Sequence, residues 1–315
     1  MALSEDRIKG PAAKPLALKR GDTIGVVSLA AAVEQQSLER GLEMVRAIGF
    51  RPRVSKHVLD RDDILAGSDR QRVEELHAFF ADPDIRAIMV ARGGYGSGRI
   101  LPLLDFEAIA LTPKPLIGFS DLTFLLNPIL ERARMVTFHG PMLAIDHPIE
   151  ERNRRAFEHL RKLLVREIDG FEMEASRVLQ PGTAEGVLIG GCLSIIVAML
   201  ATPYAPDFDD KILFLEEVGE RAYRIDRMLV QLRQSGALER CAGIVFGAIR
   251  PYGNEENEAR MIQRFAAEQT AGLEIPVLFG IDAGHFTNNL TLPFGVRARL
   301  DSDAQRLTIL ESGLF

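Results

Sequence analysis

The chain has 315 residues, more than one compact core usually contains, so we expect two domains. Hydrophobic residues make up 47% and charged residues 26% of the sequence, the balance of an ordinary globular protein. The formal net charge of -6, without blocks of Lys and Arg, argues against a nucleic-acid partner, and the apolar stretches are too short to span a bilayer.

Short apolar runs alternate along the chain with longer segments of helical period. After the first run, Leu38, Leu42, Val45 and Ile48 recur at helical spacing and predict a helix that buries this face. Such alternation is typical of an α/β fold with largely parallel sheets. The runs that predict strands are Thr23–Val27, Ala87–Val90, Leu116–Phe119, Ile212–Leu215, Ile244–Phe246 and Val277–Phe279.

The composition changes near residues 151–170, which predicts a domain boundary. Glu151 opens a charged helix that runs to about Val165, and an irregular polar connection follows. We expect an N-terminal domain with a parallel sheet of Rossmann or flavodoxin type and a C-terminal mixed α/β domain, with the active site at their interface. The expected ranges are 1–165 for the first domain, 166–182 for a linker and 183–315 for the second domain.

A glycine-rich segment, Ala91–Arg99, follows the second apolar run. Four glycines in six residues let the backbone approach a ligand and point its N–H groups inward, as in an anion or oxyanion cradle. A plain tight turn is the alternative. A dinucleotide site is disfavoured because Arg99 stands where that motif needs its third glycine. Arg99 is able to clamp a substrate carboxylate or to pair with Asp105.

Ser120 follows the third apolar run, at a predicted strand-to-helix turn. A serine placed there lies close to backbone N–H groups that can stabilise an oxyanion, so it is a candidate nucleophile. Leu122 replaces the second glycine of the usual hydrolase elbow, which excludes the standard signature. In the alternative interpretation Ser120 caps the next helix, a function that Asp121 is also able to serve.

Two further segments supply an acid and a base. Glu216 and Glu217 end an apolar strand and point in opposite directions, so one of them can orient a histidine. His285 follows a glycine in a loop of small and polar residues, and His139, before a rigid turn, competes with it as the base. Histidine spacings typical of a zinc site do not occur, and we expect neither a metal nor a cofactor.

These segments together resemble the LD-carboxypeptidase family of serine peptidases, which includes muropeptide LD-carboxypeptidases and self-immunity peptidases that cleave microcin C. The chain departs from the family at Cys192, where an asparagine is frequent, and at Glu217, where an aspartate is usual. The segments that carry the resemblance are residues 19–24, 65–69, 92–96, 118–121, 139–142, 215–220, 223–229 and 284–285.

The resemblance implies a Ser-Glu-His triad with Ser120 as nucleophile, Glu216 as acid and His285 as base, Glu217 being the second choice for the acid. It also implies an oxyanion hole formed by the backbone N–H groups of Gly94 and Asp121. No metal or organic cofactor takes part in this chemistry.

The implied substrate is a murein tetrapeptide that loses its terminal D-alanine from an L-centre, and Arg92 and Arg99 are the candidates for binding the terminal carboxylate. A microcin-like aminoacyl nucleotide is the rival substrate, and a non-catalytic protein that binds small anions is the rival from another class. The family suggests a homodimer. Two cysteines and a first segment without an apolar signal core favour the cytoplasm.

Overall fold

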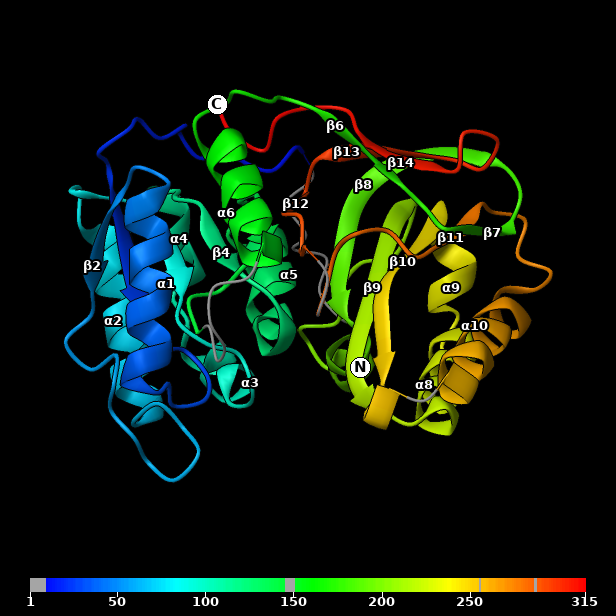
Figure 1. Cartoon of the computed structure of the whole chain (residues 1–315), viewed down its shortest axis with the longest axis horizontal. Helices are drawn as coiled ribbons and strands as arrows, with labels where there is room; N and C mark the ends of the chain where they lie inside the picture. Colours follow the sequence, from blue (N-terminus) through cyan, green and yellow to red (C-terminus); the bar gives the residue numbers. More distant parts are fainter. Residues whose placement is uncertain (1–9, 145–150, 255, 286–287) are drawn as a thin grey trace. The chain divides into compact units, whose positions relative to one another are not determined.

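The computed structural model describes residues 10–144, 151–254, 256–285 and 288–315. These residues form two compact units, each with its own β-sheet (Figure 1). The first unit comprises Met1–Ile168, Leu290–Gly295 and Gly313–Phe315, and the second comprises Asp169–Asn289 and Val296–Ser312. Across the described ranges, every helix is too short or too polar to cross a membrane.

The sheet of the first unit has the strand order β2-β1-β3-β4-β5 and then β12. The first five strands are parallel, and β12 pairs with β5 in the antiparallel direction. This order is that of flavodoxin-like folds, so the predicted fold of the N-terminal half is confirmed. The strands are β1 (Thr23–Val27), β2 (Arg51–Val54), β3 (Ile85–Val90), β4 (Leu116–Gly118), β5 (Thr137–His139) and β12 (Leu292–Phe294).

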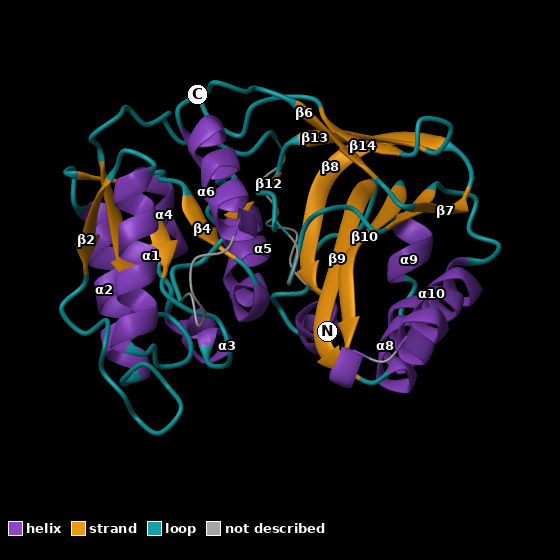
Figure 2. Cartoon of the chain, in the orientation of Figure 1, coloured by secondary structure: helices purple, strands orange, loops and turns teal. Residues whose placement is uncertain are grey.

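Helices cover both faces of this sheet (Figure 2). Helix α1 contacts α6, whereas α2 contacts α4, and α4 contacts α5. Helix α1 connects β1 to β2, and α2 connects β2 to β3 on the other side of β1. Connections that run in opposite directions along a parallel sheet place their helices on opposite faces. The helices are α1 (Gln35–Ala47), α2 (Asp69–Ala81), α3 (Ser97–Ile100), η1 (Leu101–Leu103), α4 (Phe106–Leu111), η2 (Ser120–Leu122), α5 (Thr123–Arg132) and α6 (Glu151–Leu164).

The sheet of the second unit has the order β6-β14-β13-β8-β9-β10-β11-β7. Strands β8 to β11 are parallel and those outside them are antiparallel, which gives the predicted mixed sheet. The strands are β6 (Phe171–Glu174), β7 (Arg177–Gln180), β8 (Thr183–Cys192), β9 (Lys211–Glu220), β10 (Gly243–Pro251), β11 (Val277–Phe279), β13 (Arg297–Asp301) and β14 (Arg306–Ile309). The helices are α7 (Leu193–Met199), α8 (Ala222–Gln234), α9 (Ala237–Arg240), η3 (Tyr252–Asn254) and α10 (Glu256–Thr270).

Residues 166–182, expected as an irregular linker, contain the two edge strands β6 and β7 of the second sheet. Edge strands need only one pairing partner and tolerate polar side chains, so their sequences lack the apolar run of a central strand. Two pieces of the expected C-terminal domain, Leu290–Gly295 and Gly313–Phe315, belong to the first unit instead.

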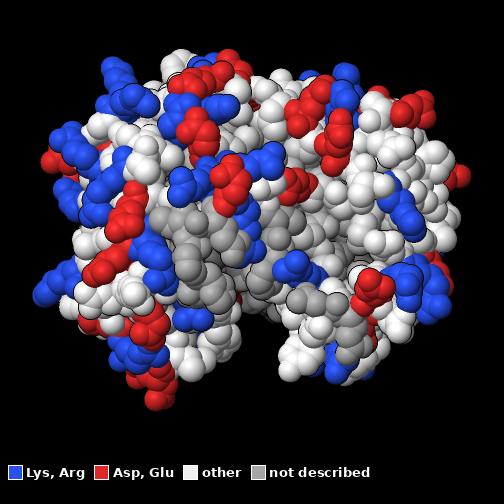
Figure 3. All heavy atoms as spheres, in the orientation of Figure 1, with Lys and Arg blue, Asp and Glu red and all other residues white. Residues whose placement is uncertain are grey.

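The carboxyl ends of the central strands carry the segments that the sequence singled out. The glycine-rich segment follows β3 and Ser120 follows β4, next to the point where the strand order of the first sheet reverses between β1 and β3. Ligands of such sheets bind outside this switch point. Positive and negative side chains are interspersed over the face of the molecule that Figure 3 shows.

Candidate active site

Ser120 lies at a sharp turn between β4 and η2, where its backbone has a φ of +62°. Positive φ is uncommon for residues other than glycine and stores strain that is frequent at functional sites. Among the described residues, Phe119 and Leu122, the N-cap positions of η2 and α5, make no side-chain capping hydrogen bond. Ser120, the residue expected as the nucleophile, thus occupies a strained strand-to-helix turn.

The glycine-rich segment packs directly against this turn. A Cβ atom on Gly93 would lie 3.1 Å from Ser120 Cβ and 3.3 Å from Ser120 Oγ. Gly94 has a φ of +95°, and a Cβ there would lie 2.8 Å from the Cβ of Ala31. Gly94 thus requires glycine, because a side chain there would collide with the loop after β1, and a side chain at position 93 would press on Ser120. The glycine-rich segment is therefore in close contact with the Ser120 side chain.

Glu216 and His285 form a buried pair in the second unit. Oε2 of Glu216 lies 2.6 Å from Nδ1 of His285 and accepts a hydrogen bond from the His285 backbone N–H at 3.2 Å. The Glu216 side chain is fully buried and that of His285 is 15% exposed. Because a carboxylate only accepts, Nδ1 carries the proton, and Nε2 of the neutral ring is the nitrogen that can act as a base.

The pKa of His285 is shifted by opposing causes. Burial has the largest effect and lowers it, whereas the charge of Glu216, the hydrogen bond to Glu216 and the charge of Glu217 raise it. The net pKa is above the ordinary value for histidine. The protonated form of the His285 imidazole is therefore stabilised by Glu216.

Glu217 points away from this pair, as expected for adjacent residues of a strand. Its carboxylate accepts hydrogen bonds from the backbone N–H groups of Ser194 at 2.7 Å and Val218 at 2.9 Å, and Cys192 Sγ lies 3.4 Å from Oε2. Burial is the main cause of the raised pKa values of both Glu217 and Cys192. Glu217 and Cys192, the two departures from the family pattern, thus contact each other, and Glu216 is the carboxylate that faces His285.

The two candidate arginines have different surroundings. Arg99 forms a bidentate ion pair with Asp69, with both distances at 3.0 Å, rather than the expected pair with Asp105. Both donors on this side of its guanidinium are therefore engaged. Arg92 is half-buried and donates from Nη1 to the carbonyl of Ala32 at 2.9 Å.

His139, the competing base, lies within β5 and is fully buried. The centroid of its ring lies 5.7 Å from the ring centroids of Phe119 and Phe294. His139 is therefore more deeply enclosed than His285, whose side chain is 15% exposed. Among the residues described, no group of three or more His, Cys, Asp or Glu side chains is placed to hold a metal ion.

Sequence reasoning missed three side chains around the glycine-rich segment: Arg72, Ser97 and the carboxylate of Asp121. Arg72 shares the buried face of α2 with Leu76 and Phe80, at positions four residues apart. An arginine on an apolar helical stripe is a signal for a buried hydrogen-bonding function and was available from the sequence. Ser97 and the Asp121 carboxylate gave no such signal, because their pairing depends on two loops that meet only in the fold.

The structure thus brings Ser120 together with the glycine-rich segment in the first unit, and Glu216 together with His285 in the second. Residues 24–140 match the family described as the LD-carboxypeptidase N-terminal domain. Residues 185–300 match the family described as the LD-carboxypeptidase C-terminal domain.

Several named relatives align with nearly the whole chain. A Streptomyces coelicolor protein with a carboxypeptidase name is 41% identical, with coverage of 94% of this chain and 96% of the relative. The murein tetrapeptide carboxypeptidase of Pseudomonas aeruginosa is 33% identical, with coverage of 90% and 94%. The microcin C7 self-immunity protein MccF of Escherichia coli is 29% identical, with coverage of 96% of each chain.

Solved structures show the same similarity. A muramoyltetrapeptide carboxypeptidase from Oxalobacter formigenes superposes with a TM-score of 0.81 and 28% identity, with coverage of 91% of this chain and 97% of that one. MccF in complex with glutamyl sulfamoyl guanosine superposes with a TM-score of 0.85 and 26% identity, with coverage of 96% and 99%.

Proposed function

This chain belongs to the LD-carboxypeptidase family, and we propose that it hydrolyses an L,D amide bond with Ser120, Glu216 and His285 as its catalytic triad. Its substrate is a murein tetrapeptide, from which it releases the terminal D-alanine. The observation that carries the proposal is the buried Glu216 oxygen that holds both the ring and the backbone of His285. A histidine fixed by two hydrogen bonds is suited to general-base catalysis.

In this mechanism Nε2 of His285 takes the proton of Ser120 while Oγ attacks the carbonyl of the scissile amide. Glu216 holds the tautomer and stabilises the imidazolium. His285 then protonates the leaving amine of D-alanine, and a water molecule, activated by His285, resolves the acyl-enzyme. The proposal requires the two units of the chain to bring Ser120 Oγ within hydrogen-bond reach of His285.

The oxyanion of the tetrahedral intermediate is assigned to the backbone N–H groups of Gly94 and Asp121. The support is the contact of Gly93 with Ser120, which puts the backbone of the glycine-rich segment beside the nucleophile. Asp121 directly follows Ser120, so its N–H lies on the same turn. Two donors at this position would stabilise charge that develops only during the reaction.

The terminal carboxylate of the peptide is assigned to Arg92. Arginine recognises a carboxylate through paired, charge-assisted hydrogen bonds. Arg99 is less suited to this function, since Asp69 already engages its guanidinium. Arg92 retains donors beyond the one that holds Ala32, because a guanidinium carries five N–H bonds.

Replacement of the nucleophile tests the proposal. Ser120→Ala should lower kcat by about 10⁴- to 10⁶-fold and leave the melting temperature close to that of the wild type. Release of D-alanine from tetrapeptide, measured by mass spectrometry, is the readout. A fluorophosphonate probe should label the wild type and should fail to label Ser120→Ala and His285→Ala. Near-normal turnover by Ser120→Ala would overturn the proposal and would favour a binding protein or another nucleophile.

A second substrate class is favoured by one observation, the similarity to MccF structures, including a complex with aspartyl sulfamoyl adenosine. Tetrapeptide, pentapeptide and an aminoacyl sulfamoyl nucleotide should therefore be incubated with the enzyme in parallel. Loss of D-alanine from tetrapeptide alone supports the murein assignment, whereas cleavage of the nucleotide conjugate alone supports the microcin-like assignment.

The assembly and the cellular location complete the proposal. We assign the enzyme to the cytoplasm, where recycled muropeptides are processed, and to a homodimer. Sedimentation equilibrium gives the mass of the particle, and 34.9 kDa is the mass expected for a single chain. A mass near twice this value at micromolar concentration supports the homodimer, and the mass of a single chain contradicts it.

A further inference from the structure

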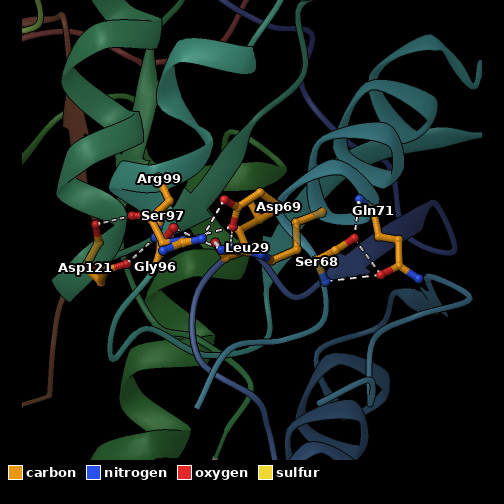
Figure 4. A network of polar contacts seen from close by, with 9 residues as sticks. Leu29, Ser68, Asp69, Gln71, Gly96, Ser97, Arg99 and Asp121 are labelled. Carbon is orange, nitrogen blue, oxygen red and sulfur yellow. Dashed lines mark hydrogen bonds and ion pairs between the residues drawn. The ribbon is translucent and has the colours of Figure 1, made fainter. Parts of the chain in front are cut away.

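Asp121 makes two hydrogen bonds to one residue of the glycine-rich segment. Its Oδ2 accepts from the backbone N–H of Ser97 at 2.8 Å, and its carbonyl oxygen accepts from Ser97 Oγ at 2.6 Å (Figure 4). Both residues are buried, with exposures of 3% and 0%. The glycine-rich segment contacts Ser120 at Gly93. Near its other end, Ser97 is held by Asp121, the residue that follows Ser120.

Arg72 holds the same segment from the other side. Its Nη1 donates to the carbonyl of Gly96 at 3.0 Å and to the carbonyl of Leu29 at 2.8 Å, and its Nη2 pairs with Asp69. Arg72 is 1% exposed, so solvent does not compete for these bonds. The loops that follow β1, β3 and β4 are thus joined through one guanidinium and one carboxylate.

Gly96 is the residue at which the two attachments meet. Its φ is +128°, and a Cβ there would lie 2.6 Å from Leu65 and 3.0 Å from Arg72 Nη1. The backbone between Gly94 and Ser97 therefore has little freedom to shift, although it contains glycines. Burial raises the pKa of Asp121, and the hydrogen bonds from Ser97, the charge of Arg72 and the N–H of Gly96 oppose that rise.

We infer that Arg72, Ser97 and Asp121 form a loop clamp that fixes the Gly94 N–H relative to Ser120, with the Asp121 side chain as its central positioning residue. The inference rests on the proposed function, because the clamp matters to catalysis only if Gly94 and Asp121 donate to the oxyanion. Asp121 then has two separate functions. Its backbone N–H contacts the reacting oxygen, and its carboxylate holds the second donor in place.

The clamp should affect the transition state more than the bound substrate. A displacement of about 1 Å in a catalytic group can cost about 100-fold in rate, because oxyanion stabilisation depends steeply on donor geometry. Asp121→Asn keeps one acceptor oxygen but replaces the other with a donor that faces backbone N–H groups. Ser97→Ala keeps the N–H that reaches the carboxylate and removes the hydroxyl that donates to the Asp121 carbonyl.

The test measures kcat and KM for tetrapeptide in Asp121→Asn, Ser97→Ala and Ser120→Ala. We expect kcat to fall about 10- to 100-fold in Asp121→Asn and less in Ser97→Ala, with KM within about threefold of the wild type. The second-order rate of fluorophosphonate labelling should fall in parallel with kcat. Melting temperatures identify any variant that fails to fold. If Asp121→Asn does not fold, Ser97→Ala, which is the milder change, still tests the clamp.

Asp105→Asn is the matched control. Asp105 Oδ1 also accepts a backbone N–H, that of Ala108 at 2.9 Å, and caps α4 in the same unit. This variant should lose a similar stability and keep kcat. If Asp121→Asn and Ser97→Ala keep wild-type kcat while Ser120→Ala is inactive, the clamp is wrong and the proposed function stands. If Ser120→Ala is active, the proposed function is wrong, and so is the clamp that rests on it.

Discussion

One carboxylate oxygen of Glu216 serves both the ring and the backbone of His285, at 2.6 Å from Nδ1 and 3.2 Å from the backbone nitrogen. The ring is thus oriented by the same atom that fixes the loop from which it projects. Loss of this oxygen disturbs the tautomer and the position of the imidazole together.

Glu216→Gln should lower kcat by about 10³- to 10⁴-fold, because a side-chain amide can donate to Nδ1 and stabilise the wrong tautomer. Glu217→Gln is the matched control on the neighbouring residue. It loses charge beside the N-terminus of α7 but does not touch His285, so it should cost about 1–2 kcal/mol in the free energy of unfolding and less than tenfold in kcat. The reverse order of the two effects on kcat would assign the acid to Glu217.

The pH dependence follows from the raised pKa of His285. The base must be neutral, so kcat/KM should rise with pH, and the midpoint of this acidic limb should lie above the ordinary histidine value of about 6.5. The free energy of unfolding has the opposite trend. Because the folded-state pKa is raised, stability from protonated His285 is fully present below about pH 6.5 and is lost as pH rises through the raised pKa.

Urea unfolding of the wild type and His285→Gln at several pH values measures that contribution. The stability advantage of the wild type should shrink as pH increases. An advantage that grows with pH would contradict the raised pKa, whatever the activity of the two proteins.

Gly284→Ala should inactivate the enzyme. Gly284 has a φ of +103°, and a Cβ would lie 2.8 Å from both Cβ and Oε2 of Glu216. The substitution must push the His285 loop away from its carboxylate. Gly236→Ala is the control, since Gly236 has a φ of +71° with open space around it and carries only the backbone strain, about 1–2 kcal/mol. Equal kcat values for the two variants would show that contact with Glu216 is unimportant.

Arg92→Ala should raise KM for tetrapeptide about 10- to 100-fold, through loss of a charge-assisted contact to the terminal carboxylate. The wild type should prefer the free acid over the C-terminal amide of the same peptide, and the variant should not. A larger rise of KM in Arg99→Ala would assign the carboxylate to Arg99 despite its ion pair with Asp69.

The sequence predicted the strands that are buried on both faces of their sheet. The apolar runs before Ser120, Glu216 and His285 all correspond to central strands, β4, β9 and β11, because a strand covered on both faces needs continuous apolar residues. Strand β2, with the sequence Arg-Pro-Arg-Val, was missed because an edge strand of a parallel sheet lacks that requirement.

Helix α1 shows a different limit. Its spacing predicted that Leu42 is buried, whereas Leu42 is half-buried and Met44 is buried instead. A Cβ on Gly41 would collide with the backbone of Leu143, so the helix approaches that segment closely on the Gly41 side. The contact turns the buried face toward Ser37, Gly41 and Met44. The helical period of the sequence alone could not predict this rotation, because the rotation depends on the contact with Leu143, which is distant in the sequence.

The sequence indicated which residue types form the candidate site, but it did not indicate the hydrogen bonds that hold them in place. A serine at a strand-to-helix turn and a histidine after glycine are visible in sequence because the chemistry restricts the residue types. The buried bonds of Arg72 and Ser97 depend on which loops meet, and the family resemblance did not include them. The choice between Glu216 and Glu217 likewise needed the direction in which each side chain leaves β9.

The strand β12 has a consequence for how this protein is made. It pairs with β5, yet more than 150 residues separate the two in the chain, and Gly313–Phe315 at the very end also belongs to the first unit. A ribosome must therefore synthesise the chain beyond Phe294 before the first sheet receives its last strand. Until then, the edge of β5 is exposed to any other strand that is available. An attempt to express residues 1–165 as a separate nucleophile domain would make that transient state permanent.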